Sequence, residues 1–492
     1  MKSLRWLFDK APTPATAEEV EAAKRRTMKV STVEGSVWSF MSGFGETYIM
    51  PFAVFLKASN RALAFLGTMP ALIGAVSQTA GAALTDRLGR RRGPLVLFCL
   101  IQALAFLPLF LVPRLFPRYG VLAVILFAAL AIGAGNAVAP AWLSLMSEVV
   151  PTAQRGDFFG RRGRVVVLTV FLATLGAGGL LSLYQRAGMV WAGFGVLFGV
   201  AFVARLISVH LLTRHYDPPY RPTAQDYFSF WAFLRRMPYS NFARFAVGAA
   251  LMNGAISVAS PFITVFFLRD LKWSYAQFTV NAAAFQVIQF VLVRWWGRMG
   301  DRHGNRAVIV ATSCLMPVIP LLFAMTTNYW LLLLIQMFAG VAWSGFAIAT
   351  QNFTFDAVTP PKRARVTAYM TILNGTFTLL GGALLGAWLA SHLPTHYRLG
   401  GWKVAFLSPL PALFVVSAGL RLIAALLFLP SFKEVRVAEP IHPAMLLLRL
   451  SGGEAIAGLL QEAVARLPLP RKRKGSNGAR GVASKQDERP GL

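Results

Sequence analysis

One acidic residue lies in the middle of the first long apolar run of the chain. Glu46 is preceded by Gly45 and lies two residues before Tyr48, roughly at the centre of the stretch 36–56. A carboxylate at the middle of a bilayer costs ~2.5–3.5 kcal/mol even on insertion scales, so we expect Glu46 to face a bundle interior or water. There it could relay a proton or pair with a cation. The alternative is a structural glutamate, protonated or hydrogen-bonded to its neighbours.

A second candidate for chemistry is a charged motif that occurs twice. The sequence Asp-Arg-x-Gly-x-Arg begins at Asp86 and again at Asp301, 215 residues later. Each copy lies between two long apolar runs, where a hairpin at the membrane surface could pair its charges with those of neighbouring helices. A simple orientation signal would need no second copy. A hairpin repeated at half the chain length indicates internal duplication.

Other pairs of segments repeat at nearly the same offset. Glu148 precedes Arg155 by seven residues, and Asp356 precedes Arg363 by the same distance, at an offset of 208. Each pair follows an apolar run, the fourth and the tenth. The duplication therefore places an acid and an arginine at matching helix ends in both halves.

The sixth and twelfth apolar runs share a third repeat. Leu-Phe-x-Val-x4-Arg-Leu-Ile occurs with its arginine at Arg205 and again at Arg421, at an offset of 216. Long arginine side chains near a helix end can extend to the aqueous interface. We interpret both arginines as extending to the cytoplasmic face in this way.

Twelve apolar runs are long enough to cross a bilayer, which takes ~20 residues in a helix. The chain is 56% hydrophobic and 14% charged, with a mean hydropathy of +0.55, which excludes an ordinary soluble protein. The sequence therefore predicts an all-α integral membrane protein with twelve transmembrane helices in two pseudo-symmetric six-helix bundles. The predicted spans are 36–56, 62–84, 94–113, 120–147, 165–184, 188–213, 245–268, 276–296, 307–325, 329–352, 367–390 and 404–429.

The net charge of +29 reflects membrane topology. Twenty basic residues lie at the loops and span ends assigned to the cytoplasm, against nine on the other side. This bias follows the positive-inside rule and places both termini in the cytoplasm. A nucleic-acid-binding protein would gather its basic residues on one soluble module, which the sequence lacks.

Several function classes find no support in the sequence. The two cysteines, Cys99 and Cys314, both fall inside apolar runs, so we expect neither a disulfide framework nor a metal site. There is no nucleotide-binding motif and no recognisable pairing of a nucleophile with a base. We expect no cofactor and no enzymatic activity.

The domain boundaries follow from the apolar runs. We predict a cytoplasmic N-terminal tail at 1–33, with a charged helix over 18–26, and a polar linker at 214–242. The two bundles cover 34–213 and 243–430. A C-terminal cytoplasmic tail covers 431–492, and its basic cluster Arg471–Lys474 either contacts anionic lipid or lies in water.

Over roughly residues 30–432 the chain resembles a bacterial member of the major facilitator superfamily. The resemblance is carried by the two six-helix halves, the hairpin motif and its copy. It implies that Asp86 contacts the cytoplasmic end of the eleventh helix in the outward-facing state and that Arg87 pairs with Glu148 at the end of the fourth. Asp301, Arg302 and Asp356 would form the mirror set. The implied gate and conformational switch comprises Gly81, Asp86, Arg87, Gly89, Arg90, Arg91, Glu148, Arg155, Asp301, Arg302, Gly304, Arg306, Asp356 and Arg363.

The candidate proton-coupling or substrate residues are polar or aromatic and lie near the middle of the predicted spans. They are Glu46, Tyr48, Asn136, Trp142, Asn253, Gln286, Gln289, Trp343 and Asn374. Each alone is more often a packing contact between helices than a ligand contact. Together they predict a polar, weakly acidic and aromatic cavity. The fifth span has the glycines of drug–proton antiporters at 176–179 and lacks their proline.

The leading hypothesis is a monomeric secondary active transporter in the cytoplasmic (inner) membrane. It would move a small molecule by alternating access, coupled to a proton or another ion, with membrane lipid as its surroundings and no nucleic-acid partner. Export of an amphipathic or cationic compound and import of a nutrient are both open. The alternative hypothesis is a membrane sensor or scaffold of the same fold. The intact charged motif in both halves argues against it.

The predicted topology can be tested with reporter fusions. Fusions at Arg92, Asn305 and the C-terminus should all report the cytoplasm, because the arginine excess lies on that side. One periplasmic signal among the three would overturn the assignment.

Overall fold

The computed structural model describes residues 16–151, 154–218, 239–358, 360–399 and 402–436, with isolated positions at 231, 235, 438, 439, 441, 445 and 446. The chain divides into Met1–Leu446, which carries every described element, and Leu447–Leu492, which lies outside the described residues. Most of the predicted linker, the basic cluster Arg471–Lys474 and the side chain of Arg363 also lie outside the description.

The N-terminal bundle contains six membrane-crossing segments, the first of them broken. Its elements are α2 (Ala17–Phe44), η2 (Glu46–Tyr48), α3 (Ile49–Phe55), α4 (Asn60–Leu88), α5 (Arg92–Leu115), η3 (Pro117–Tyr119), α6 (Gly120–Val149), α7 (Arg155–Arg186) and α8 (Val190–Thr213). The break falls at Gly45, where an added Cβ would lie 2.7 Å from Phe106 and 2.8 Å from Ala201. Close packing against two other helices thus requires glycine at this position.

The C-terminal bundle repeats this order. Its elements are α10 (Asn241–Ser257), α11 (Ser260–Val265), η5 (Phe266–Asp270), α12 (Tyr275–His303), α13 (Asn305–Leu315), α14 (Val318–Met325), α15 (Tyr329–Ala357), α16 (Pro360–Leu379), η6 (Leu380–Gly386), α17 (Ala387–His392), β1 (His396–Leu399), β2 (Trp402–Ala405) and α18 (Pro409–Phe428). The strands form one antiparallel hairpin, with Leu399 opposite Trp402, that the sequence did not predict.

The fold confirms the predicted all-α membrane architecture. In the described part of the chain, eleven helical segments are long and apolar enough to cross a membrane, and they match the second to the twelfth predicted span. The first predicted span corresponds to the broken series α2, η2 and α3. It begins earlier than expected, because α2 continues the charged N-terminal helix without interruption from a capping box at Thr16 and Glu19.

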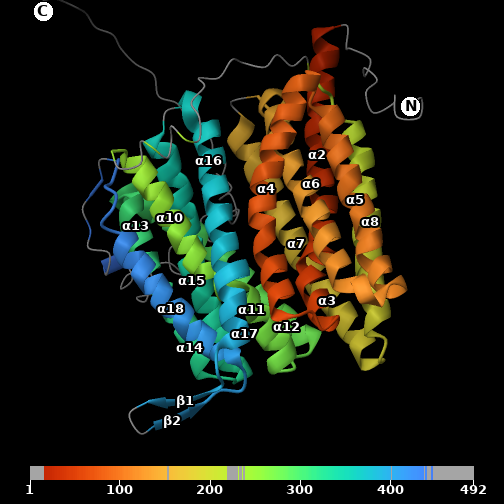
Figure 1. The fold of residues 1–492 in the computed structure, drawn as a ribbon. Helices are drawn as coiled ribbons and strands as arrows, with labels where there is room; N and C mark the ends of the chain where they lie inside the picture. Colours follow the sequence, from red (N-terminus) through yellow and green to blue (C-terminus); the bar gives the residue numbers. More distant parts are fainter. Residues whose placement is uncertain are drawn as a thin grey trace, which may run out of the picture. The chain divides into compact units, whose positions relative to one another are not determined.

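Packing of α4 and α7 against helices of the second bundle joins the two bundles. In Figure 1, α16 lies beside α4, and α7 and α12 also pack against each other. Small residues allow the close approach: a Cβ added to Gly375 of α16 would lie 2.8 Å from the backbone of Leu72 in α4. Each bundle has its own aromatic core, centred on Phe52 in the first and on Phe267 and Phe323 in the second.

The N-terminal bundle holds a buried ionic cluster that the sequence interpretation missed. Glu34 of α2 is 4% exposed, and its carboxylate lies 3.4 Å from Arg162 of α7 and 3.8 Å from Arg205 of α8. Ser208 donates a hydrogen bond to Glu34 at 2.8 Å and accepts one from Arg205 at 3.0 Å. Burial lowers the pKa of the neighbouring His215, which is 1% exposed.

The expectation that Arg205 extends to the cytoplasmic face was wrong. The side chain is 2% exposed, because Glu34 and Ser208 supply oxygen atoms inside the bundle. A guanidinium that is paired with a carboxylate and hydrogen-bonded to a hydroxyl inside the protein does not need to extend to the aqueous interface. The cluster therefore ties α2, α7 and α8 together.

The same expectation was wrong for Arg421, which is 3% exposed and is held in another way. Its guanidinium donates to the carbonyl oxygens of Met316 at 3.1 Å and Ile256 at 3.3 Å. Pro320 lies four residues after Met316 and has no N–H for that carbonyl. Carbonyl groups at helix ends carry partial negative charge. Arg421 is thus bound by the broken ends of α10 and α13.

We expect Glu34→Gln to destabilise the protein strongly, because two buried guanidinium groups would lose their counter-charge. Breaking a buried ion pair from one side costs ~3–5 kcal/mol. Thermal unfolding of the purified protein in detergent measures the effect. Glu46→Gln is the control, since the partners of Glu46 are the uncharged Ser42 and Gln102. Equal unfolding temperatures for Glu34→Gln and the wild type would contradict the proposed role of the cluster.

Candidate functional site

Two adjoining cavities lie on the inner faces of the helices. The larger has a volume of about 460 Å³ and is lined by α2 and α7 of the first bundle and by α12 and α15 of the second. Its walls are mostly aliphatic and aromatic. The polar lining side chains are Gln286, Gln289, Ser344 and Gln351. Two of the predicted substrate residues, Gln286 and Gln289, therefore line a cavity between the bundles.

The smaller cavity, of about 270 Å³, belongs to the second bundle. It is lined by residues of α10, α15 and α16, including the predicted Asn253, Trp343 and Asn374. Asn253 donates a hydrogen bond to Asn374 at 3.3 Å. The two cavities share Ala347 and Gln351, so they adjoin along α15. Amide and aromatic groups can orient a ligand by hydrogen bonds and ring contacts.

A buried hydrogen-bond junction closes the space beyond the larger cavity. The hydroxyl of Tyr48 lies 2.8 Å from the hydroxyl of Thr279 in α12 and donates to the carbonyl of Thr174 in α7 at 3.0 Å. Gly178 packs directly against Thr279, where a Cβ would clash with the threonine side chain. Tyr48 thus joins the two bundles instead of lining a cavity.

Further contacts between the bundles lie at the helix ends opposite the charged hairpins. At the start of α4, Asn60 donates to the carbonyl of Ala390 at 2.9 Å and accepts from Arg269 at 2.7 Å. The backbone N–H of Tyr275 donates to Gln185 at 3.2 Å. The cavity is therefore closed at this end of the bundles, and its lining residues lie nearer the hairpin end of each helix.

Glu46 lies outside the linings of both cavities, at the break between α2 and α3. Its carboxylate accepts hydrogen bonds from Ser42 at 2.8 Å and from Gln102 of α5 at 2.9 Å, and the side chain is partly exposed. The side-chain amide oxygen of Gln102, Oε1, is buried and has no hydrogen-bond partner. Gln102 was missed from the sequence, although a lone amide in the apolar run 94–113 was a usable signal.

Asn136 and Trp142 also lie outside the cavity linings. Asn136 accepts from Gln78 at 3.3 Å and packs against Gly74, which joins α6 to α4. The guanidinium of Arg162 lies 4.2 Å from the ring centroid of Trp142, a cation–π contact. Both residues therefore make packing contacts within the N-terminal bundle.

The first charged hairpin brings together residues that the motif predicts, with one change of partner. Glu148 accepts from Arg91, which also donates to Ser144 at 2.9 Å. The expected pairing of Arg87 with Glu148 is wrong in this structure. Gly89 ends α4 in the left-handed conformation, with φ of +60°, and the turn leaves Arg87 exposed while it directs Arg91 toward α6.

Three other residues of this hairpin region have defined places. Gly81 packs directly against the backbone of Ala137, where a Cβ would clash, so glycine is needed for the contact between α4 and α6. Asp86 is exposed at the end of α4. Arg155 donates to the carbonyl oxygens of Ser147 and Val150, at the end of α6. The contact predicted for Asp86 with the eleventh helix involves side chains outside the description and stays a prediction.

In the second hairpin, the segment after α18 supplies the partners. Arg436 lies 2.8 Å from Asp301 and 2.8 Å from Asp356, and these hydrogen bonds raise its pKa. Arg302 pairs with Glu439 at 2.9 Å. The predicted mirror set of Asp301, Arg302 and Asp356 is therefore wrong in its pairing, because Arg436 occupies the place expected for Arg302. The sequence motif contains no signal for this residue.

The two hairpins share a capping arrangement that the sequence analysis also missed. In the first, Asp217 accepts from the backbone N–H groups of Arg91 and Arg92 at 3.2 and 3.0 Å. In the second, Glu434 accepts from the N–H of Arg306 at 2.7 Å, beside Gly304 with its φ of +89°. In both bundles an acid that follows the sixth helix caps the third, where a negative charge is favoured.

A family model described as "Major Facilitator Superfamily" matches residues 36–266 and 245–460. The chain belongs to the major facilitator superfamily. The match covers both bundles and includes both charged hairpins.

Relatives within the superfamily are named as transporters. An uncharacterized transporter of the superfamily, YcnB of Bacillus subtilis (strain 168), is 25% identical over 80% of this chain and 85% of its own length. The multidrug resistance protein MdtG of Proteus mirabilis (strain HI4320) is 22% identical over 51% of this chain and 61% of its own length. This superfamily member is therefore a multi-pass membrane transporter rather than an enzyme.

Solved structures of the superfamily share the fold. An auto-inhibited peptide transporter of the POT family aligns with a TM-score of 0.64 and 13% identity, covering 85% of this chain and 99% of that one. The nucleoside transporter NupG aligns with a TM-score of 0.61 and 15% identity over 84% of this chain and 99% of that one. At these identities the likeness concerns the fold alone.

We expect Arg91 and Glu148 to be coupled in stability and Arg87 and Glu148 to be independent. In a double-mutant cycle with Arg91→Gln and Glu148→Gln, the coupling free energy should fall in the range of ~0.5–3 kcal/mol. The matched cycle with Arg87→Gln should give a coupling near zero, because Arg87 is exposed. Thermal or denaturant unfolding in detergent supplies the values. Coupling confined to Arg87 would contradict the observed pairing.

Proposed function

We propose that the chain is a secondary active transporter that moves a small amphipathic molecule by alternating access, driven by a proton gradient. The main support is the arrangement along the bundle interface. The cavity between α2, α7, α12 and α15 is closed at one end by contacts between the bundles, and its walls lie nearer the charged hairpins. In transporters built from structural repeats, the substrate site lies near the middle of the membrane. The two bundles rock around that site and so expose it to each side of the membrane in turn.

The contacts that close one end are suited to reversible opening. They consist of a few hydrogen bonds, those of Tyr48 and Asn60 among them, and of glycine residues against backbone or small side chains. No described ion pair joins the bundles at this end. Breaking these hydrogen bonds and forming a second set of contacts between the bundles has a modest cost in free energy. The hairpin ends supply charged residues for that second set.

Glu46 is the proposed coupling residue. Its carboxylate now accepts from the amide nitrogen of Gln102, whose oxygen is buried without a partner. When Glu46 takes up a proton, its O–H becomes a donor, and rotation of the amide by half a turn presents the orphaned oxygen as the acceptor. Protonation of Glu46 and the orientation of Gln102 are thus linked, next to the break at Gly45 in the first membrane span.

The cavity linings favour a substrate that is apolar over most of its surface, with a few hydrogen-bonding groups. Trp343, Phe346 and Met370 supply the apolar area, and Asn253 and Asn374 supply amides. No carboxylate lies among the lining residues of either cavity in the described part of the chain, so charge does not favour a cation here. Similarity to relatives named for multidrug resistance favours export of such compounds over import of a nutrient.

The experiment compares two flux assays on proteoliposomes, with a panel of labelled amphipathic compounds. Glu46→Gln should abolish accumulation driven by a pH gradient, because the side chain can no longer exchange a proton. Counterflow of substrate without a gradient should continue. Glu46→Asp keeps the carboxyl group and should retain part of the coupling. Gradient-driven accumulation by Glu46→Gln at the wild-type level would show that the coupling site lies elsewhere or that protons are not coupled.

A further inference from the structure

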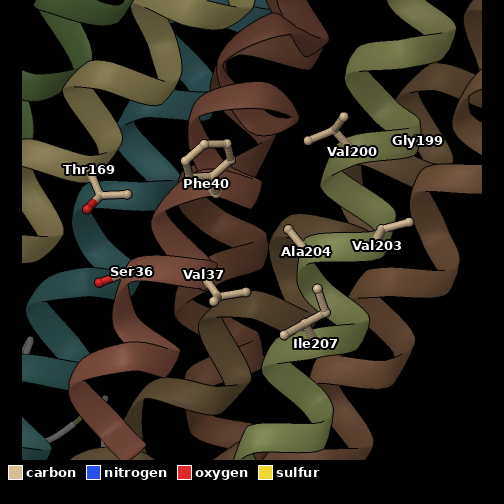
Figure 2. Close-up of a pocket in the computed structure, with 9 residues that line it drawn as sticks. All are labelled: Ser36, Val37, Phe40, Thr169, Gly199, Val200, Val203, Ala204 and Ile207. Carbon is tan, nitrogen blue, oxygen red and sulfur yellow. The ribbon is translucent and has the colours of Figure 1, made fainter.

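An apolar groove of about 570 Å³ lies in the N-terminal bundle, away from the two cavities. Figure 2 shows its walls: Val37 and Phe40 of α2 on one side, and Val200, Ala204 and Ile207 of α8 on the other. Thr169 of α7, with Ser36, Gly199 and Val203, completes the lining. The lining is almost entirely carbon, which suits a hydrocarbon chain.

The groove opens on the outer surface of the bundle. Phe40, Val203 and Ile207 are 43%, 53% and 47% exposed, although all three lie within membrane-crossing segments. In a bilayer this surface faces lipid. An added Cβ at Gly199 would meet no atom within 4 Å, so the groove is open at that point. An acyl chain of the surrounding lipid can therefore enter from the side.

Basic residues continue the groove on both walls toward the hairpin end. On α2, Lys29 lies seven residues before Ser36, and on α8, Arg214 lies seven residues after Ile207; both basic side chains are exposed. Seven residues are two helical turns, so each basic residue stands on the same helix face as the groove, ~10 Å further along. Among the described residues, no ion pair joins either of them to a carboxylate.

We propose that this groove binds an anionic phospholipid of the leaflet at the hairpin end, which the arginine asymmetry assigns to the cytoplasm. One acyl chain lies between α2 and α8, and the phosphate is bound by Lys29 and Arg214. Basic residues at the cytoplasmic edge of membrane helices are the recognised means of selecting anionic headgroups. The cluster around Glu34 does not form part of the headgroup site, because Glu34, Arg205 and Ser208 are buried inside the bundle.

Native mass spectrometry of the full chain in detergent, titrated with phosphatidylglycerol or phosphatidylcholine, tests the proposal. The wild type should bind one phosphatidylglycerol more tightly than phosphatidylcholine. Lys29→Gln with Arg214→Gln should weaken phosphatidylglycerol binding about twenty-five-fold, at about five-fold per basic residue, and leave phosphatidylcholine binding unchanged. Gly199→Leu should weaken the binding of both lipids, because its side chain extends from a Cβ position that meets no atom within 4 Å and occupies part of the groove.

Two matched controls separate this site from general effects. Arg118→Gln with Arg186→Gln removes two exposed arginines at the other membrane surface. Gly419→Leu adds the same side chain to α18, where a Cβ also meets no atom within 4 Å. Neither should change lipid binding. Any one of three results would overturn the proposal. The wild type could bind the two lipids with equal affinity, the arginine control could lose as much phosphatidylglycerol affinity as the Lys29 and Arg214 variant, or Gly199→Leu could bind both lipids as tightly as the wild type. Size-exclusion chromatography verifies that every variant is folded.

Discussion

Charges inside a membrane-crossing bundle need partners within the protein, because the bilayer supplies none. The two halves meet this constraint differently at matching positions. Arg205 is held by the carboxylate of Glu34, whereas Arg421 is held by the carbonyl oxygens of Met316 and Ile256. The Arg205 guanidinium joins α8 to α2, and the Arg421 guanidinium joins α18 to α10 and to the end of α13. Each bundle is thereby stabilised by polar contacts of its own.

This distribution of contacts bears on transport. At the closed end the bundles meet through the hydroxyl groups of Tyr48 and Thr279 and through Asn60, with glycine residues allowing close approach. At the hairpin end, charged side chains are bound within their own bundle, as Arg91 is by Glu148 and Arg436 is by Asp356. Movement of whole bundles against each other would exchange a small set of contacts and leave each aromatic core intact.

The architecture could be predicted from the sequence because it depends on the length and order of apolar runs and on repeated motifs. The match of eleven predicted spans to helices reflects that, whereas the break in the first span was not predicted. Partner choice could not be predicted, because it depends on local geometry. The left-handed turn at Gly89 selects Arg91 over Arg87, and Arg436 arrives from a segment that carries no motif. Burial of Glu34 required knowing that α2 is continuous.

The most direct test of alternating exposure is double electron–electron resonance on spin-labelled protein, with Cys99 and Cys314 replaced. Labels at Arg61 and His392 report the closed end, and labels at Leu88 and Arg298 report the hairpin end; all four sites are exposed. Across substrate and pH conditions, the first distance should lengthen as the second shortens. Distances that stay fixed, or that lengthen and shorten together, would contradict the account.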